Sequence, residues 1–269
     1  MAQVNNYTVE NFDPEVLREY DIRGVVGENI NENTAYTIGR TFGHTVKSKL
    51  ASHTIVTGYD GRLTSPSLHK ALCEGLKDSG VKVINIGMGP TPMTYFAHYY
   101  FEADAAVMLT GSHNPSEYNG FKMVFNKHSF FAEDIQSLQK LLDNNELEFA
   151  EGQIINQDIT EEYIERDLSN ISLNRKLKVA WDPGNGAMGK VTRKITEQLI
   201  NSENIIINEE VDGNFPNHHP DPTVPKNMIQ LIQAVKENSC DIGLGFDGDG
   251  DRLGVIDNLG NIVWADQYM

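Results

Sequence analysis

The 269-residue chain has few cysteines, no long apolar run and no excess of basic residues. Its two cysteines, Cys73 and Cys240, lie far apart in apolar segments, so we expect reduced, buried thiols in a cytoplasmic protein rather than a disulfide scaffold. No stretch approaches the roughly 18 apolar residues that a membrane span needs, and the polar N-terminus lacks an apolar targeting segment. A membrane is therefore not an expected partner.

Basic residues are outnumbered, because 22 Lys and Arg face 38 Asp and Glu and give a formal net charge of −16. Such a surface repels a phosphate backbone, so nucleic acid is not an expected partner either. A small anionic ligand stays compatible with this charge if a few Arg and Lys residues and a metal ion reverse the field locally. Those residues should gather in the motifs of the chain.

Strand-length apolar runs alternate with helical patterns, which predicts α/β layers rather than a helical bundle or a β-sandwich. The length suits two domains, each with its own core. The first half shows this alternation well. We expect strands over 54–59, 81–86, 105–109 and 121–125, and helices between the cap Ser65 and the stop Gly80, over 91–101 and over 132–144.

The segment 145–158 has no clear period, so we place the domain boundary there, with a first domain over 1–150 and a second over 151–264. The second half restarts the alternation. Its expected elements are helices over 161–170, from the turn after 181 to 200 and through 228–235, and strands over 178–181, 205–208, 241–246, 253–257 and 262–264.

A polar run, Thr110 to Pro115, follows the predicted strand 105–109 and places Ser112 on an exposed turn at the rim of a sheet. Gly111 lets the backbone approach a phosphate closely, while His113 and Asn114 add polar groups beside the hydroxyl. A capping serine in a structural turn is the alternative, and the run taken alone favours it. The segment that follows it favours a functional role.

The pair Asn119-Gly120 is typical of a tight turn, which can fold the next strand back so that Lys122 faces Ser112. An ammonium there stabilises charge on a phosphate, and with a pKa lowered by burial it can exchange the proton of a hydroxyl. Outside such a setting, a lysine at a strand start is a solvated surface residue.

Three carboxylates, Asp247, Asp249 and Asp251, alternate with glycines directly after a predicted strand. Acids this close repel one another, and a hard cation such as Mg²⁺ relieves the repulsion with oxygen ligands. An EF-hand loop also begins Asp-x-Asp-x-Asp, but it needs glycine at position six and glutamate at position twelve, where this chain has Arg252 and Asn258. Two interpretations of this segment therefore remain, a magnesium-binding loop and an acidic turn that is only solvated.

Together, the run from Thr110 to Lys122 and the loop from Asp247 to Arg252 resemble the active-site signature and the metal loop of the α-D-phosphohexomutases. The segment Glu19 to Gly24 is similar to the opening motif of that family. The resemblance implies two consecutive three-layer α/β domains with mixed sheets, and it implies roles for matching residues. Ser112, Lys122 and Arg23 would be catalytic, Tyr20, His113, Asn114 and Arg252 would bind substrate or phosphate, and Asp247, Asp249, Asp251 and Ser112 would hold Mg²⁺.

The family resemblance further implies an isomerase that moves phosphate between C1 and C6 of a glucose or mannose phosphate. Ser112 would carry the phosphate, with hexose 1,6-bisphosphate as intermediate and activator. Residues 265–269 would begin a linker to two further domains, for sugar specificity and for phosphate binding, so we expect this chain alone to be weak or inactive. A non-catalytic fragment that binds sugar phosphate or metal is the alternative. The oligomeric state and the preferred sugar do not follow from the sequence.

Two other segments, Gly58 to Arg62 and Asp182 to Gly186, also resemble parts of the family, but tight turns between strand and helix explain them and we assign them structural roles. His218 and His219 are adjacent in a proline-rich loop, and no third ligand lies at metal-binding spacing. We therefore expect both to be loop residues.

Overall fold

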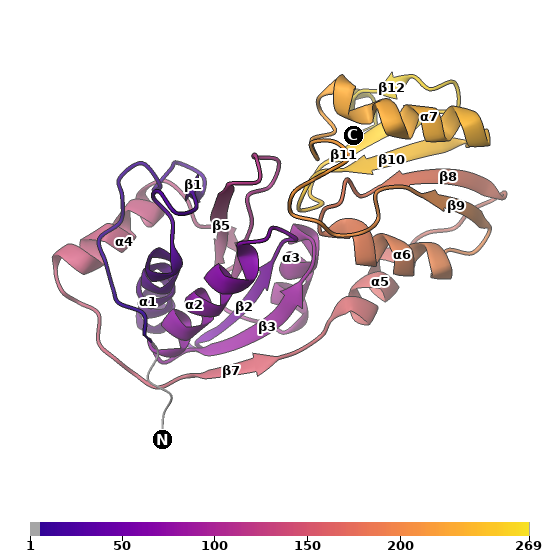
Figure 1. Cartoon of the computed structure of the whole chain (residues 1–269). Helices are drawn as coiled ribbons and strands as arrows, with labels where there is room; N and C mark the ends of the chain where they lie inside the picture. The colour runs from indigo at the N-terminus through magenta and orange to yellow at the C-terminus, as the bar shows by residue number, and fades with distance from the viewer. Residues whose placement is uncertain (1–5, 269) are drawn as a thin grey trace.

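The computed structural model describes residues 6–268 and contains two mixed β-sheets, one in each half of the chain (Figure 1). The first sheet has the order β1-β5-β4-β2-β3-β7, with β6 beside β5. Its central pairs are parallel, whereas β5 runs antiparallel to both β4 and β1. The strands are β1 (Ile22–Val25), β2 (Thr54–Tyr59), β3 (Lys82–Met88), β4 (Ala105–Leu109), β5 (Tyr118–Phe125), β6 (His128–Ser129) and β7 (Gln153–Asn156).

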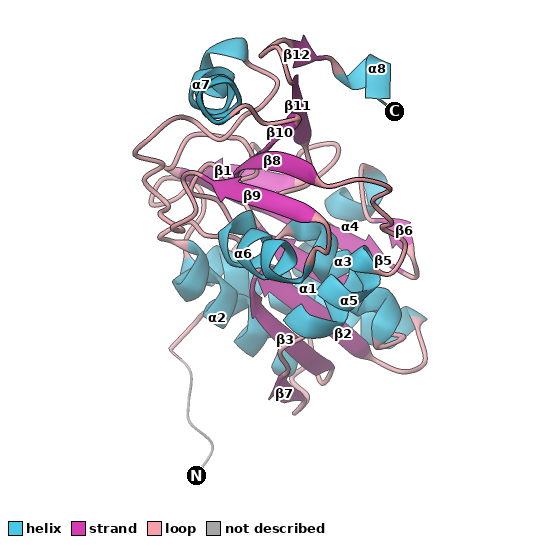
Figure 2. Cartoon of the chain, turned by 90° about the vertical axis from the view of Figure 1, so that its right-hand side faces the viewer, coloured by secondary structure: helices cyan, strands magenta, loops and turns pink. Residues whose placement is uncertain are grey.

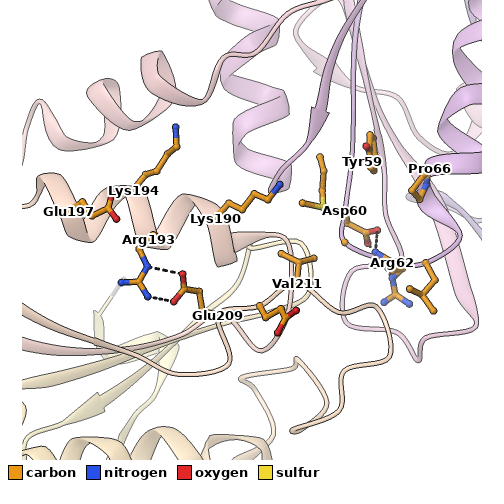
Figure 3. A pocket seen from close by; sticks show the side chains of 14 residues that line it. Tyr59, Asp60, Arg62, Pro66, Lys190, Arg193, Lys194, Glu197, Glu209 and Val211 are labelled. Atoms are coloured by element: carbon orange, nitrogen blue, oxygen red, sulfur yellow. Dashed lines mark hydrogen bonds and ion pairs between the residues drawn. The ribbon is translucent and has the colours of Figure 1, made fainter.

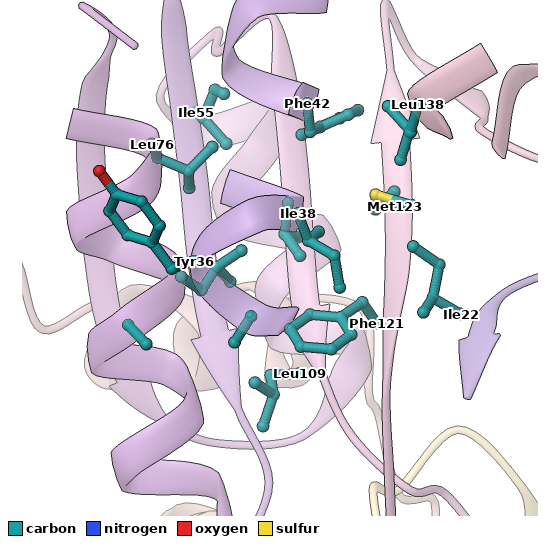
Figure 4. Close-up of a cluster of buried hydrophobic side chains, with 14 of the residues drawn as sticks. Ile22, Tyr36, Ile38, Phe42, Ile55, Leu76, Leu109, Phe121, Met123 and Leu138 are labelled. Atoms are coloured by element: carbon teal, nitrogen blue, oxygen red, sulfur yellow. The ribbon is translucent and has the colours of Figure 1, made fainter. Parts of the chain in front are cut away.

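Helices cover both faces of this sheet because successive strand residues point to opposite sides. Ile55 of β2 lies in a core with α1 (Glu32–Lys49), α2 (Ser65–Lys77) and α4 (Glu133–Asp143), as Figure 4 shows. Its neighbour Val56 lies in a second core with α3 (Thr91–Tyr100). The first half is therefore a three-layer α/β arrangement.

The helices α1 and α2 approach each other closely because glycines line their contact. A Cβ added to Gly39 would lie 2.4 Å from the carbonyl oxygen of Leu72, and one added to Gly75 would lie 2.2 Å from that of Tyr36. The start of α1 is fixed by Asn31, whose side chain accepts from the backbone amides of Asn33 and Thr34. This helix was not expected from the sequence.

The second sheet has the order β12-β11-β10-β8-β9, with β8 parallel to β9 and β10, and with β11 antiparallel to its neighbours. It is therefore also mixed. Its strands are β8 (Leu177–Asp182), β9 (Ser202–Ile206), β10 (Ile242–Phe246), β11 (Leu253–Asp257) and β12 (Ile262–Val263), and its helices are α5 (Thr160–Leu168), α6 (Met188–Gln198), the 3₁₀ turn η1 (Pro225–Met228), α7 (Ile229–Asn238) and α8 (Ala265–Tyr268).

The helices α3, α5 and α6 form a shared layer between the two sheets. One buried apolar cluster joins Met93 of α3, Ile164 of α5 and Val191 of α6 to strand residues of both sheets. On its opposite face, the second sheet is covered by α7, as Figures 1 and 2 show. Both halves are thus three-layer α/β units, as expected, and a continuous core holds them together.

Several local expectations need correction. Because β7 pairs in parallel with β3, the first unit extends beyond residue 150, and the segment 145–158 is not all loop. Asn119 and Gly120 lie inside β5, since the chain reverses earlier, where the amide of Tyr118 donates to the carbonyl of Pro115 at 3.1 Å. Ser65 is the first helical residue rather than the cap, because its hydroxyl bonds the Asp60 carboxylate instead of the helix end.

Both cysteines are free and buried, as expected. Within residues 6–268, no helix combines the length and the apolar character needed to cross a membrane. The expected linker 265–269 falls partly on α8, while Met269 lies outside the described residues, as do residues 1–5 of the expected first domain.

Candidate functional site

Two predicted loops meet where the two halves of the chain touch: the serine loop, residues 110–117, and the acidic loop, residues 247–252. The first follows β4 and the second joins β10 to β11. They approach so closely that a Cβ on Gly248 would lie 2.6 Å from the carbonyl oxygen of Ser112. From the start of α3, the amide of Thr91 donates to the carbonyl of Asp249 at 2.8 Å. Residues far apart in sequence thus form one site.

Ser112 is held in an unusual conformation at the end of β4. Its φ of +52° lies in the left-handed region, which is unfavourable for a residue other than glycine. Its hydroxyl lies 3.3 Å from Asp247 Oδ2 and 3.1 Å from His113 Nδ1. Its amide donates to Thr110 Oγ1 at 2.7 Å. The side chain is therefore aimed at the acidic loop.

The expectation that Ser112 is exposed is wrong, because the residue is only 2% exposed. Loops of the second half cover it, as His219 Nε2 lies 2.6 Å from the carbonyl oxygen of His113 and Gly248 lies against Ser112 itself. Ser112 still lines a cavity of about 580 Å³. This cavity is therefore the open space that borders the serine.

The acidic loop presents oxygen atoms in a cation-sized cluster. One carboxylate oxygen from each of Asp247, Asp249 and Asp251 lies within 4.8 Å of the others. Asp247 and Asp249 are fully buried, and Asp249 Oδ1 has no hydrogen-bond partner among the described residues. Burial, together with the neighbouring charges of Asp249 and Asp251, raises the pKa of Asp247. The three residues therefore fit a hard metal ion, which would pair the orphaned oxygen and relieve the repulsion.

Lys122 lines the same cavity as Ser112, but its ammonium contacts the acidic loop. Nζ lies 2.7 Å from Asp249 Oδ2 and 2.6 Å from Asp251 Oδ2. Burial opposes the charge on Lys122, yet the two carboxylates outweigh it and raise the pKa of the ammonium. The expected lowering of this pKa is therefore wrong, because the sequence does not reveal that β5 brings Lys122 to the acids.

Basic side chains surround the cavity beside Ser112. Arg23 of β1 is 8% exposed, and its guanidinium bonds Asp21 Oδ2 at 2.5 Å and the side-chain oxygen of Asn114. Tyr20, by contrast, is 75% exposed. Four cations thus line the cavity together with the serine and three acids. The lining consists of Arg18, Glu19, Tyr20, Asp21, Arg23, Ser112, His113, Lys122, Asp251 and Arg252.

His113 and Arg252 take different places at this cavity. Burial, followed by the nearby charge of Arg252, lowers the pKa of His113, which favours a neutral ring beside the Ser112 hydroxyl. The backbone amide of Arg252 donates to Asp247 Oδ1 at 3.0 Å, while its side chain is exposed. The guanidinium is therefore free to meet an anion.

Sequence reasoning missed the contribution of Asp60 and Arg62, which it treated as parts of a structural turn. Both are buried, and both bond the serine loop, Asp60 through Thr110 and Gly111 and Arg62 through main-chain carbonyls. The likeness of Gly58 to Arg62 to a family segment was the signal available. His219 was also missed, since nothing in its spacing indicates a partner more than 100 residues away.

A second, larger cavity of about 1020 Å³ lies between the halves. Figure 3 shows Lys190, Arg193 and Lys194 of α6 on one side of it and Asp60 and Arg62 on the other. Its lining includes neither Ser112 nor the acidic loop. The smaller cavity is therefore the candidate site for chemistry.

Fold and site together define a two-sheet α/β protein whose serine loop meets a metal-compatible acidic loop. Residues 14–148 match the family described as phosphoglucomutase/phosphomannomutase, alpha/beta/alpha domain I, and residues 161–260 match alpha/beta/alpha domain II of the same family. The chain belongs to the phosphoglucomutase/phosphomannomutase family.

Similar proteins cover nearly all of the chain. A phosphomannomutase/phosphoglucomutase of Pseudomonas putida is 46% identical over 254 residues, which are 94% of this chain and 54% of that protein. A phosphoglucomutase of Neisseria gonorrhoeae is 41% identical over 95% of this chain and 55% of its own length. The crystal structure of a family protein from Burkholderia thailandensis has a TM-score of 0.89 and 38% identity, over 95% of this chain and 57% of that one. The chain therefore spans about half the length of these relatives.

Proposed function

We propose that this chain transfers phosphate between Ser112 and a hexose phosphate, as part of a phosphohexomutase that moves phosphate between C1 and C6. The observation that carries the proposal is the placement of the Ser112 hydroxyl, 3.3 Å from Asp247 Oδ2 in a cavity lined by four cations. A nucleophilic oxygen, a metal-compatible acidic loop and fixed positive charges are the parts that phosphoryl transfer needs.

In the proposed reaction, the bond between phosphorus and the Ser112 oxygen breaks as a bond from phosphorus to a sugar hydroxyl forms. The reverse transfer, from the other end of a hexose 1,6-bisphosphate, restores the phosphoserine. Lys122 acts as general acid/base, and its raised pKa keeps the ammonium charged, which stabilises negative charge on the transferring phosphate. Arg23 holds phosphate as a third catalytic residue.

Substrate binding falls to polar groups around the cavity. Tyr20 and Arg252 are exposed there and free to contact a sugar phosphate, while His113 and Asn114 flank the transferred group. The guanidinium of Arg252 suits a phosphate because it is always charged and donates in a fixed fork. The names of the relatives support glucose and mannose phosphates as substrates. We propose hexose 1,6-bisphosphate as the activator.

We propose Mg²⁺ as the ion held by Asp247, Asp249 and Asp251, with an oxygen on Ser112 as a further ligand. When bound, this ion would neutralise charge on the transferring phosphate. The orphaned Asp249 Oδ1 supports the assignment. We also propose two domains that divide just after β7, and a cytoplasmic location, which the two free cysteines support.

The test is uptake of phosphate from radiolabelled glucose 1,6-bisphosphate in the presence of Mg²⁺. We expect label on the wild-type chain and none on Ser112→Ala. Ser116→Ala is the matched control, because Ser116 is exposed in the same loop and should take no part. Equal labelling of Ser112→Ala and the wild type would show that Ser112 is not the carrier.

The 269-residue chain by itself should accept phosphate but interconvert glucose 1-phosphate and glucose 6-phosphate slowly. Its cavity is open enough to leave Tyr20 75% exposed, so a bisphosphate intermediate has a free path to water. Positioning of the reacting groups can supply about 7 kcal/mol or more of a barrier, and an open site forgoes part of it. A coupled dehydrogenase assay measures the rate, and a rate equal to that of a full-length relative would contradict this expectation.

A further inference from the structure

Arg62 is the most buried basic side chain near Ser112, and the proposed chemistry leaves it without a role. It lies in the loop after β2 and is 2% exposed. Its guanidinium donates to three main-chain carbonyls of the serine loop and to one at the start of β5. Nη1 reaches the oxygens of Pro115 at 2.5 Å and Tyr118 at 3.0 Å, and Nη2 reaches those of Ser112 at 2.9 Å and Asn114 at 2.6 Å.

The fifth donor of this guanidinium, Nε, bonds Asp60 Oδ2 at 3.2 Å, so every donor is used. Asp60 in turn accepts from Thr110 Oγ1 at 2.8 Å and from the amide of Gly111 at 3.1 Å. Its other oxygen accepts from Ser65 Oγ at 2.6 Å. The acid therefore holds both the guanidinium and the first residues of the serine loop.

The surroundings leave Arg62 little freedom to move. A Cβ on Gly111 would lie 2.3 Å from Arg62 Cζ, so the glycine provides the space that the guanidinium fills. From the second half, the Phe215 ring lies 5.4 Å from Cζ. A Cβ on Gly213 would lie 2.8 Å from Arg62 Cα. The guanidinium is thus fixed from both halves of the chain.

We propose that Arg62 is a positioning residue that holds Ser112 in its left-handed conformation and keeps the hydroxyl aimed at Asp247. This inference rests on the proposed function for its effect on transfer. A conformation with φ of +52° persists only where surrounding bonds enforce it. The bond from Nη2 to the Ser112 carbonyl, together with three bonds to the residues that follow, provides that enforcement.

The larger cavity makes this proposal testable by chemical rescue. Arg62 is part of its lining, so removal of the side chain opens a space that a small cation can enter from solvent (Figure 3). Guanidinium ion has the planar donor fork that the four carbonyls and Asp60 require. Urea has a similar shape without the charge, and ammonium has the charge without the fork.

The first measurement is hydrogen exchange at the amides of residues 111–118, in Arg62→Ala and Arg62→Lys. Lysine keeps the charge beside Asp60 but has three donors on one atom, so it cannot span four carbonyls. We expect faster exchange in this loop than in wild type for both variants, with unchanged exchange in β10. Millimolar guanidinium chloride, unlike urea or ammonium, should slow it again in Arg62→Ala. Wild-type exchange in Arg62→Lys would overturn the proposal.

The second measurement is the single-turnover rate of phosphate transfer from glucose 1,6-bisphosphate to Ser112. A displacement of about 1 Å at a reacting group costs about 100-fold in rate, so we expect a loss of that order in both variants and partial recovery with guanidinium in Arg62→Ala. Wild-type transfer by Arg62→Lys would refute a positioning role. Wild-type chain that takes no label, with faster loop exchange in the variants, would refute the proposed function and leave Arg62 as the holder of the loop.

Discussion

Gly248 is the position where one added methyl group should uncouple the acidic loop from the serine loop. In Gly248→Ala, the new Cβ would lie 2.6 Å from the Ser112 carbonyl oxygen. Ordinary contact begins near 3.4 Å, so the two loops must separate by 3.4 − 2.6 = 0.8 Å. Both partners are backbone, which gives way less easily than a side chain. Overpacking of this kind costs about 1–3 kcal/mol of stability.

The same displacement should affect transfer more than stability, because a shift near 1 Å costs about 100-fold in rate. Gly245→Ala is the matched control, since its Cβ would meet only the flexible side chains of Leu231 and Met228, at 3.2 Å. We would measure thermal unfolding and single-turnover phosphate uptake for both. Uptake at the wild-type rate by Gly248→Ala, with an unchanged Tm, would refute the coupling of the two loops.

Three further predictions concern the metal, the pH and the core. Mg²⁺ should raise the Tm of the wild-type chain, because it binds the folded state, and should leave that of Asp249→Asn unchanged; an equal rise in both would count against the metal site. Burial opposes the charge on His218, but Asp182, 2.8 Å away, outweighs it and raises the pKa of the imidazole. The stability that this pair contributes should therefore be fully present below about pH 6.5 and be lost as the pH rises through the pKa of His218 in the folded state. Urea unfolding at several pH values measures this dependence, and His218→Gln should remove it. Gly75→Ala should destabilise the α1–α2 contact by about 1–3 kcal/mol in the same assay, because its Cβ would lie 2.2 Å from the Tyr36 carbonyl; unchanged stability would show that the helices can separate freely.

The alternation of β2, α2 and β3 was predictable because the apolar residues of each element follow the pattern of a strand or of a helix. The helix α1 was not, since its buried face carries Thr37, Thr41 and Thr45, which look polar in a sequence. Their hydroxyls bond helix carbonyls four residues earlier, at 2.8–2.9 Å, and so become compatible with a core. The strand β7 was not predicted for another reason, because a short edge strand whose residues are mostly exposed has little hydrophobic signal.

At the candidate site, sequence motifs predicted roles for Ser112 and the three aspartates, and the structure brings these residues together. The burial of Ser112 and the raised pKa of Lys122 were not predictable, since both follow from the contact between two halves more than 100 residues apart. Arg62 was missed for a similar reason. Four of its five donors bond main-chain carbonyls, and every residue type has such a carbonyl, so the sequence gives no sign of which ones Arg62 will contact.

Transfer of a phosphate from Ser112 to a sugar is the step on which the proposed function depends. The most direct test mixes chain labelled on Ser112 with unlabelled glucose 1-phosphate and Mg²⁺, and follows the label by thin-layer chromatography. We predict that the label leaves the chain and appears in hexose bisphosphate in equal amount, and that Asp249→Asn, labelled in the same way, releases it far more slowly. Label that stays on Ser112, or that appears only as inorganic phosphate, would contradict the account and favour a binding fragment without transferase activity.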